Sequence, residues 1–258
     1  MSEQVLVTSE GPIATITIAR PEKLNAFDLS MLRALAQACD AVEANRDIRA
    51  VILTGQGKAF SAGGDIHAWG AMTPNEFGHD WVRFGHRVFS RLAGLRMPVI
   101  AALNGHALGG GLELAACADI RVAESQIKIG MPETSLGMVP GWSGTQRLVR
   151  RFGAQNVRRM VLAGEVFSAV EAANLGIVDH LATAGGALAQ AREIAVGIAH
   201  RGPAALEIAK LMLASAEGED SDAAIEALGS MLAAKTADMA EGVAAFTGKR
   251  PAAFTGAW

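Results

Sequence analysis

The stretch GHALGGGLELAACAD, residues 105–119, joins three consecutive glycines to an apolar, alanine-rich run that contains one carboxylate, Glu113. The residues before it, VIAALNG, predict a strand, and those after Gly110 predict a helix. A helix start leaves backbone N–H groups without partners, and glycine lets a ligand approach that backbone closely. The stretch therefore predicts an oxyanion or phosphate site, with close helix packing as the alternative.

On both sides of this stretch, strand patterns alternate with helical patterns. VLVTSEGPIATITIAR predicts a hairpin, and LSMLRALAQACDAVEAN predicts a helix with Ser30 as its cap. Short strands are predicted by IRAVILTG, MPVIAALNG and IRVAES. Strands that alternate with helices indicate parallel pairing, so we expect an α/β core. After Gly153 helical patterns dominate, and we place the core at residues 1–195 and a helical C-terminal region at 196–258.

Composition excludes several classes of protein. The net charge is −3 in 258 residues, which argues against a general nucleic-acid or anionic membrane surface. Cys39 and Cys117 stand in apolar contexts and are expected to be buried thiols. No ligand spacing suggests a metal, and no signal peptide or membrane-spanning segment is recognised, so we expect a cytoplasmic protein.

Two further segments carry candidate chemistry. GKAFSAGGDI, residues 57–66, is a second glycine-rich loop after a strand, and two loops of this kind can supply the two N–H donors that a polarised carbonyl needs. Glu133 lies in a turn rich in proline and glycine, at residues 130–148. Glu113 and Glu133 would fit paired acid/base chemistry, although Glu133 alone would also fit a surface carboxylate or a charge at a helix start.

Several segments, in this order, span nearly the whole chain and carry a family resemblance: RPEKLNAFD, GKAFSAGGDI, PVIAALNGHALGGGLELAACADIRVA, MPETSLGMVPGWSGTQRL and EGVAAFTGKRPAAF. Together they resemble the enoyl-CoA hydratase/isomerase, or crotonase, family. The resemblance implies a crotonase-like spiral of ββα repeats with a helical C-terminal trimerisation region, and a homotrimer or dimer of trimers. It also implies an acyl-CoA thioester as substrate, with CoA as part of that substrate and no separate cofactor.

The resemblance assigns an oxyanion hole to the backbone N–H groups of Gly64 and Gly110. Glu113 and Glu133 stand at both catalytic glutamate positions, which favours hydration of a 2-enoyl-CoA to a 3-hydroxyacyl-CoA. By analogy, Glu113 deprotonates water for attack at Cβ and Glu133 delivers a proton to Cα, with roles that can be shared. The alternatives are Δ3,Δ2-enoyl-CoA isomerisation, another crotonase-type reaction, and a non-catalytic CoA-binding scaffold.

The resemblance also implies a CoA path. Its residues would be Lys23, Leu24, Ala26, Ala62, Asp65, Ile66, Phe246 and Lys249, the last two often serving a neighbouring subunit. A lysine at position 249 suits an anionic phosphate. The alternative for Lys249 is a solvated helix end.

Substrate choice is expected to depend on two regions. Trp142 stands where family hydratases usually carry a small residue, and its indole either reshapes the acyl site or packs away from it. The segment 67–90 contains Trp69, Met72, Phe77, Trp81 and Phe84, which suggest an apolar acyl group, although helical core packing explains them equally well. His67, His79 and His86 in this segment are expected to be surface or pocket-lining residues rather than catalytic ones.

Overall fold

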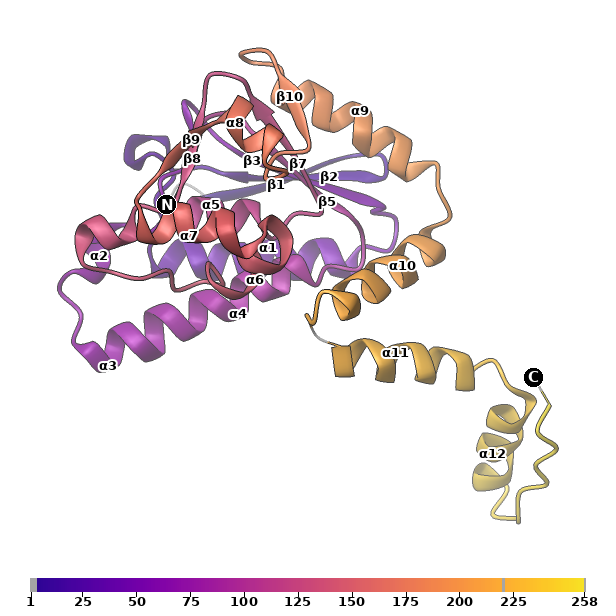
Figure 1. Cartoon of the computed structure of the whole chain (residues 1–258). Helices are drawn as coiled ribbons and strands as arrows, with labels where there is room; N and C mark the ends of the chain where they lie inside the picture. Colours follow the sequence, from indigo (N-terminus) through magenta and orange to yellow (C-terminus); the bar gives the residue numbers. More distant parts are fainter. Residues whose placement is uncertain (1–3, 220, 258) are drawn as a thin grey trace. The chain divides into compact units, whose positions relative to one another are not determined.

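The computed structural model describes residues 4–219 and 221–257 (Figure 1). The chain divides into two compact units, the first of which ends at Glu207 and the second of which begins at Ile208. The first unit contains all the strands, arranged in two sheets. The second contains the end of α10 (Pro203–Ala216), α11 (Ser221–Ala233) and α12 (Ala237–Thr247). No helix in the described ranges is both long enough and apolar enough to cross a membrane.

The larger sheet has six strands in the order β1-β2-β3-β5-β7-β10. Its strands are β1 (Val5–Glu10), β2 (Ile13–Ile18), β3 (Ala50–Gly55), β5 (Val99–Leu103), β7 (Ile120–Glu124) and β10 (His180–Ala182). The first two form the expected antiparallel hairpin, and every later pair is parallel. Parallel pairing requires crossover connections, which the intervening chain provides.

The smaller sheet has four strands in the order β4-β6-β8-β9, so its neighbouring strands also follow one another along the chain. Its strands are β4 (Ala59–Ser61), β6 (His106–Leu108), β8 (Lys128–Gly130) and β9 (Val166–Ser168). Each of β3, β5 and β7 is followed directly by a strand of the smaller sheet and then by helical structure. This repetition of strand, strand and helix is the spiral of ββα repeats that the family resemblance implies.

Residue alternation along the central strands explains how the large sheet is covered. Val51 and Leu53 of β3 join the main core, whereas Ile52 faces a second cluster that contains three alanines of α9 (Ala187–Ala199). Because side chains alternate across a strand, an uninterrupted apolar run buries both faces. Figure 1 shows α9 along one side of this sheet and α1 (Leu29–Ala44) with α4 (Arg83–Ala93) along the other.

One expectation about local structure is wrong, and a second is confirmed with an addition. Asp28, not Ser30, caps α1, since its carboxylate accepts the Met31 N–H at 2.9 Å while the Ser30 hydroxyl donates to the same carboxylate at 2.6 Å. The region after Gly153 is mainly helical, but it also supplies the short strands β9 and β10. Strands of three residues are too short to produce a readable alternation.

The remaining helices of the first unit connect the repeats. They are η1 (Pro21–Lys23), α2 (Ile66–Trp69), α3 (Pro74–Glu76), η2 (Phe77–Val82), α5 (Gly110–Ala115), η3 (Glu133–Leu136), α6 (Gln146–Phe152), α7 (Ala154–Leu162) and α8 (Ala169–Asn174). Both cysteines are buried, as expected.

Candidate active site

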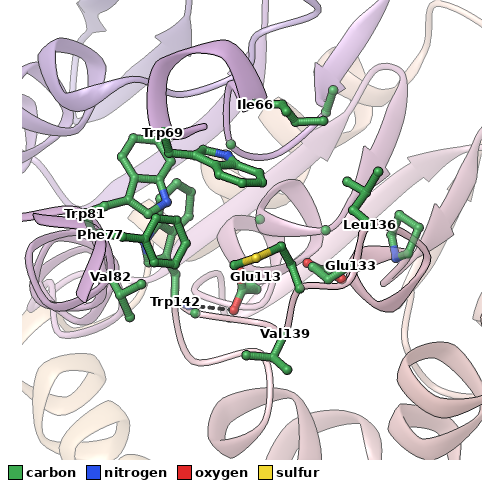
Figure 2. Close-up of a pocket in the computed structure, with 17 residues that line it drawn as sticks. Ile66, Trp69, Phe77, Trp81, Val82, Glu113, Glu133, Leu136, Val139 and Trp142 are labelled. Atoms are coloured by element: carbon green, nitrogen blue, oxygen red, sulfur yellow. Dashed lines mark hydrogen bonds between the residues drawn. The ribbon is translucent and has the colours of Figure 1, made fainter. Parts of the chain in front are cut away.

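A cavity of about 120 Å³ opens where β4, α5 and η3 meet the segment from α2 to η2. Its wall includes Gly64, Gly110, Glu113 and Glu133, which the sequence placed in one site. Large apolar side chains form most of the rest: Ile66, Trp69, Phe77, Trp81, Val82, Leu136, Met138, Val139 and Trp142. In Figure 2 the two carboxyl groups lie close together, with the aromatic side chains of Trp69, Phe77 and Trp81 on one side of them.

The three glycines of the opening stretch are each required by a close neighbour. Gly109 has φ of +54°, and a Cβ there would lie 2.8 Å from the Glu133 carboxylate. At Gly110 a Cβ would lie 2.9 Å from the Trp142 indole, and at Gly111 it would collide with the Ser61 carbonyl. The glycines therefore serve both the site and the packing of α5, so the two interpretations of this stretch are compatible.

Gly64 and Gly110 present backbone N–H groups from neighbouring loops. Gly110 is the first residue of α5, so its N–H has no partner within the helix. Gly64 forms a parallel bridge with Phe27, in which the flanking groups pair: Phe27 N–H donates to the Gly63 carbonyl at 2.8 Å, and Asp65 N–H to the Phe27 carbonyl at 2.7 Å. The Gly64 N–H itself is directed away from Phe27, and both glycines line the cavity.

Glu113 is 3% exposed, and one of its oxygens accepts two backbone hydrogen bonds. The donors to its Oε1 are Trp142 N–H at 2.7 Å and Gly144 N–H at 2.6 Å. Burial, followed by the neighbouring Glu133 carboxylate, raises the pKa of Glu113 to about 8, while the two backbone N–H groups oppose the rise. Sequence reasoning missed these two donors, because no residue pattern specifies a backbone N–H that contacts a distant side chain.

Burial also raises the pKa of Glu133. Its Oε2 is buried without a hydrogen-bond partner among the described residues. An unpartnered buried carboxylate oxygen is costly, so this atom indicates where a substrate or water group is to be received. Because the Glu133 carboxylate is the second cause of the raised pKa of Glu113, the two groups titrate as a coupled pair.

Trp142 both lines the cavity and packs in the core. Its ring centroid lies 4.9 Å from that of Trp81 and 5.0 Å from that of Phe89, and the residue is 3% exposed. Of the apolar residues noted in the segment 67–90, Trp69, Phe77 and Trp81 line the cavity, whereas Met72 and Phe84 pack against the core.

A backbone hydrogen bond connects the two loops that carry the first residues of the expected CoA path. Ala62 N–H donates to the Leu24 carbonyl at 3.0 Å, which places the loop that carries Lys23 and Ala26 beside the loop of Gly64. Ala62 and Ile66 line the cavity. Asp65 is directed elsewhere, since it forms an ion pair of 3.0 Å with Arg20 and caps α2.

Two residues of the expected CoA path belong to the second unit. Phe246, on α12, is 88% exposed. Lys249 follows the helix with φ of +49° and is exposed. The sequence analysis did not single out four residues of the cavity wall: Val82, Leu136, Met138 and Val139. The last three follow Glu133 closely in the sequence, and this proximity was the one sign that they could line the same cavity.

The spiral of ββα repeats defines a protein of the crotonase type, and its cavity brings Glu113 and Glu133 beside Gly64 and Gly110. The enoyl-CoA hydratase/isomerase family profile matches residues 8–257, and the chain belongs to this family. It is 37% identical to the short-chain-enoyl-CoA hydratase of Clostridium acetobutylicum, over 95% of each chain. It is also 37% identical to the crotonyl-CoA hydratase of Syntrophomonas wolfei, over 98% of each.

Solved structures agree with the fold. The enoyl-CoA hydratase of Bacillus anthracis superposes with a TM-score of 0.82 at 32% identity, covering 98% of this chain and 99% of that one. The chain therefore has the crotonase fold, and these relatives are named as hydratases of enoyl-CoA or crotonyl-CoA.

Proposed function

We propose that this protein is an enoyl-CoA hydratase, which adds water across the 2,3 double bond of a 2-enoyl-CoA to give a 3-hydroxyacyl-CoA. The observation that carries the proposal is the placement of Glu113 and Glu133 in one cavity with the N–H groups of Gly64 and Gly110. An isomerisation needs one acid/base group, whereas hydration uses a base for water and an acid for carbon.

The reaction assigns a role to each group. The Gly64 and Gly110 N–H groups hold the thioester oxygen as it gains negative charge. Glu113 takes a proton from water as the water oxygen bonds to Cβ, and Glu133 gives a proton to Cα. One water molecule and one double bond are consumed, and a hydroxyl and a C–H bond are formed.

The raised pKa values of the two glutamates support acid/base chemistry in this cavity. Burial raises both, and the Glu133 carboxylate raises that of Glu113 further, so one carboxyl group can stay protonated beside an ionised one. A water molecule in contact with both groups would let a proton pass between them, which is why we give the roles as shared rather than fixed.

The cavity supports a short acyl group. A cavity of about 150 Å³ is known to hold one benzene ring. The volume of about 120 Å³ is slightly smaller, so it suits a small apolar acyl group beside the aromatic side chains. The names of two relatives, a short-chain-enoyl-CoA hydratase and a crotonyl-CoA hydratase, are in keeping with this size.

We infer that the loop of Lys23, Leu24 and Ala26 contacts the CoA moiety, which is part of the substrate, and that Phe246 and Lys249 serve the CoA of a neighbouring subunit. No separate cofactor is required by this chemistry. The helices of the second unit expose large apolar side chains, among them Met212, Leu213, Ile225, Leu232, Val243 and Phe246. Exposed apolar surface of this kind supports assembly into a homotrimer or a dimer of trimers, which light scattering after size-exclusion chromatography would measure.

The test of function is direct assay with 2-enoyl-CoA substrates of increasing length. Hydration removes the ultraviolet absorbance of the conjugated enoyl thioester, whereas isomerisation of a 3-enoyl-CoA creates it. Glu113→Gln and Glu133→Gln should each lower the hydration rate by a factor on the order of 10²–10⁴. The double variant should be far less than multiplicatively worse, because both groups hold one water.

Two outcomes would overturn the proposal. Near-normal hydration by Glu113→Gln, accompanied by isomerase activity, would favour the one-glutamate reaction. Binding of acyl-CoA without turnover of any enoyl-CoA would favour a scaffold.

A further inference from the structure

The loop from Trp142 to Gly144 acts as a clamp on Glu113. The N–H groups of Trp142 and Gly144 both donate to Glu113 Oε1, at 2.7 and 2.6 Å. Ser143, between them, has φ of +83°, a conformation that residues with a Cβ rarely adopt. The two donors converge on one oxygen only while Ser143 keeps this backbone conformation, so something must hold it there.

The structure shows which groups hold the loop. The Ser143 hydroxyl lies 3.2 Å from Nδ1 of His86, on α4. One residue earlier, the Trp142 indole N–H donates to the Trp81 carbonyl at 3.3 Å. Gly85 leaves the space that the indole occupies, since a Cβ there would collide with it. Two adjacent side chains, those of Trp142 and Ser143, therefore hold the loop against the helical segment that carries Trp81 and His86.

His86 has the protonation state that this contact needs. Its pKa is lowered by burial and, next, by the positive charge of Arg147. A neutral imidazole at physiological pH can accept a hydrogen bond from the serine hydroxyl at Nδ1. Ser143 is itself buried, at 4% exposed, so few other partners reach its hydroxyl.

We propose that His86 and Ser143 form a positioning pair, which holds the 142–144 loop so that its two N–H groups orient the Glu113 carboxylate for proton transfer. Neither residue is among those that line the cavity. The catalytic part of this inference rests on the proposed function, whereas the structural part, that the pair holds the loop, does not. A glycine at position 143 would adopt the backbone conformation without strain, but it would lack the hydroxyl that reaches α4.

The test uses variants that separate the hydrogen bond from packing. His86→Leu and Ser143→Ala remove the bond, whereas His86→Asn keeps an acceptor near the position of Nδ1. His79→Leu is the matched control, because His79 is an exposed histidine of the same segment whose recorded side-chain contact is with Arg83. The double variant His86→Leu/Ser143→Ala measures whether the two residues act as one pair.

The first measurement is independent of activity: amide hydrogen exchange of the 141–146 segment in the intact protein. Exchange of the Trp142 and Gly144 N–H groups should accelerate about two- to tenfold in His86→Leu and Ser143→Ala, which is the weight of one ordinary hydrogen bond. It should stay at the wild-type rate in His86→Asn and His79→Leu. The double variant should be no faster than the single ones.

The second measurement is the pH profile of hydration. The two N–H groups lower the pKa of Glu113, so a loosened loop should move the alkaline limb to higher pH and reduce kcat about two- to tenfold with little change in KM. A merely structural role would lower the unfolding temperature without moving that limb.

The outcomes separate the two proposals. Unchanged exchange in both His86→Leu and Ser143→Ala overturns the positioning pair, whatever the activity. Changed exchange with an unmoved pH limb in an active enzyme leaves the pair a structural tie and overturns its catalytic role. Changed exchange in a protein that hydrates no enoyl-CoA rejects the proposed function, and with it that role, while the tie between loop and helix stands.

Discussion

Replacing Glu113 by glutamine should stabilise the protein in alkaline solution. The carboxyl group is buried, and its pKa in the folded protein is raised to about 8 from an ordinary value of 4.5. Because the folded state binds the proton more tightly than the unfolded state, ionisation favours unfolding. Stability is therefore complete below about pH 4.5, declines as the pH rises toward 8, and levels off above it.

The size of this loss of stability follows from the difference between the pKa of Glu113 in the folded protein and its ordinary value. Each pKa unit corresponds to about 1.4 kcal/mol, so the ceiling is about 5 kcal/mol, and water that enters the cavity will reduce it. Glutamine has no charge to bury, and its oxygen can still accept the hydrogen bonds of Trp142 and Gly144. The variant should match the wild type near pH 5 and exceed it by several degrees in Tm near pH 9.

The assay is thermal unfolding of both proteins at five values between pH 5 and pH 9. Glu22→Gln, an exposed carboxylate with a side chain 70% accessible, is the control and should follow the wild-type curve. Parallel curves for Glu113→Gln and wild type would refute the reasoning, since the burial of Glu113 would then have no energetic consequence.

The remaining predictions concern activity and packing. Hydration should fall above about pH 8, since burial and Glu133 raise the pKa of Glu113 to about 8 and the pair loses a proton there; a rate that rises through pH 9 would contradict this. Lys249→Ala should raise KM for the CoA thioester with little change in kcat, because its charge is remote from the reacting carbons; a lower kcat at unchanged KM would reject the assignment. Trp142→Gly should extend the accepted acyl length, which a substrate ranking by kcat/KM would reveal; an identical ranking would make the indole a packing residue only. Gly85→Ala should destabilise the protein by about 1–3 kcal/mol, because the added Cβ would collide with the Trp142 indole. Gly197→Ala, in open space on α9, should stabilise the protein by about 0.5–1 kcal/mol. Denaturant unfolding measures both effects, and equal effects would count against the collision.

The sequence predicted the core of the fold because the relevant patterns are local. The hairpin before residue 20, the buried strands of the large sheet and the start of α5 at Gly110 each follow from a few neighbouring residues. The spiral itself did not follow from periodicity. It depends on strands of three residues that enter a second sheet, and only the family resemblance supplied it.

The site was predicted in part for the same reason. Glu113 and Gly110 are three residues apart in one helix, so their proximity could be read directly. The clamp on Glu113 could not, because its donors come from residues about 30 positions later and from backbone rather than side chains. The sequence predicted Ser30 as the cap of α1, but Asp28 is a residue type equally favoured there, and only the backbone geometry decides between them.

The backbone hydrogen bonds that join Phe27 to the Gly64 loop have an evolutionary consequence. They hold the Gly64 N–H, one of the two proposed oxyanion donors, through main-chain atoms that side-chain substitution leaves in place. The segment from α2 to α4, which supplies much of the cavity wall, can therefore change in sequence without removing these bonds. Positions 86 and 142 are different, because His86 contacts Ser143 and the Trp142 N–H donates to Glu113, so a change at either position would need a compensating change beside that carboxylate.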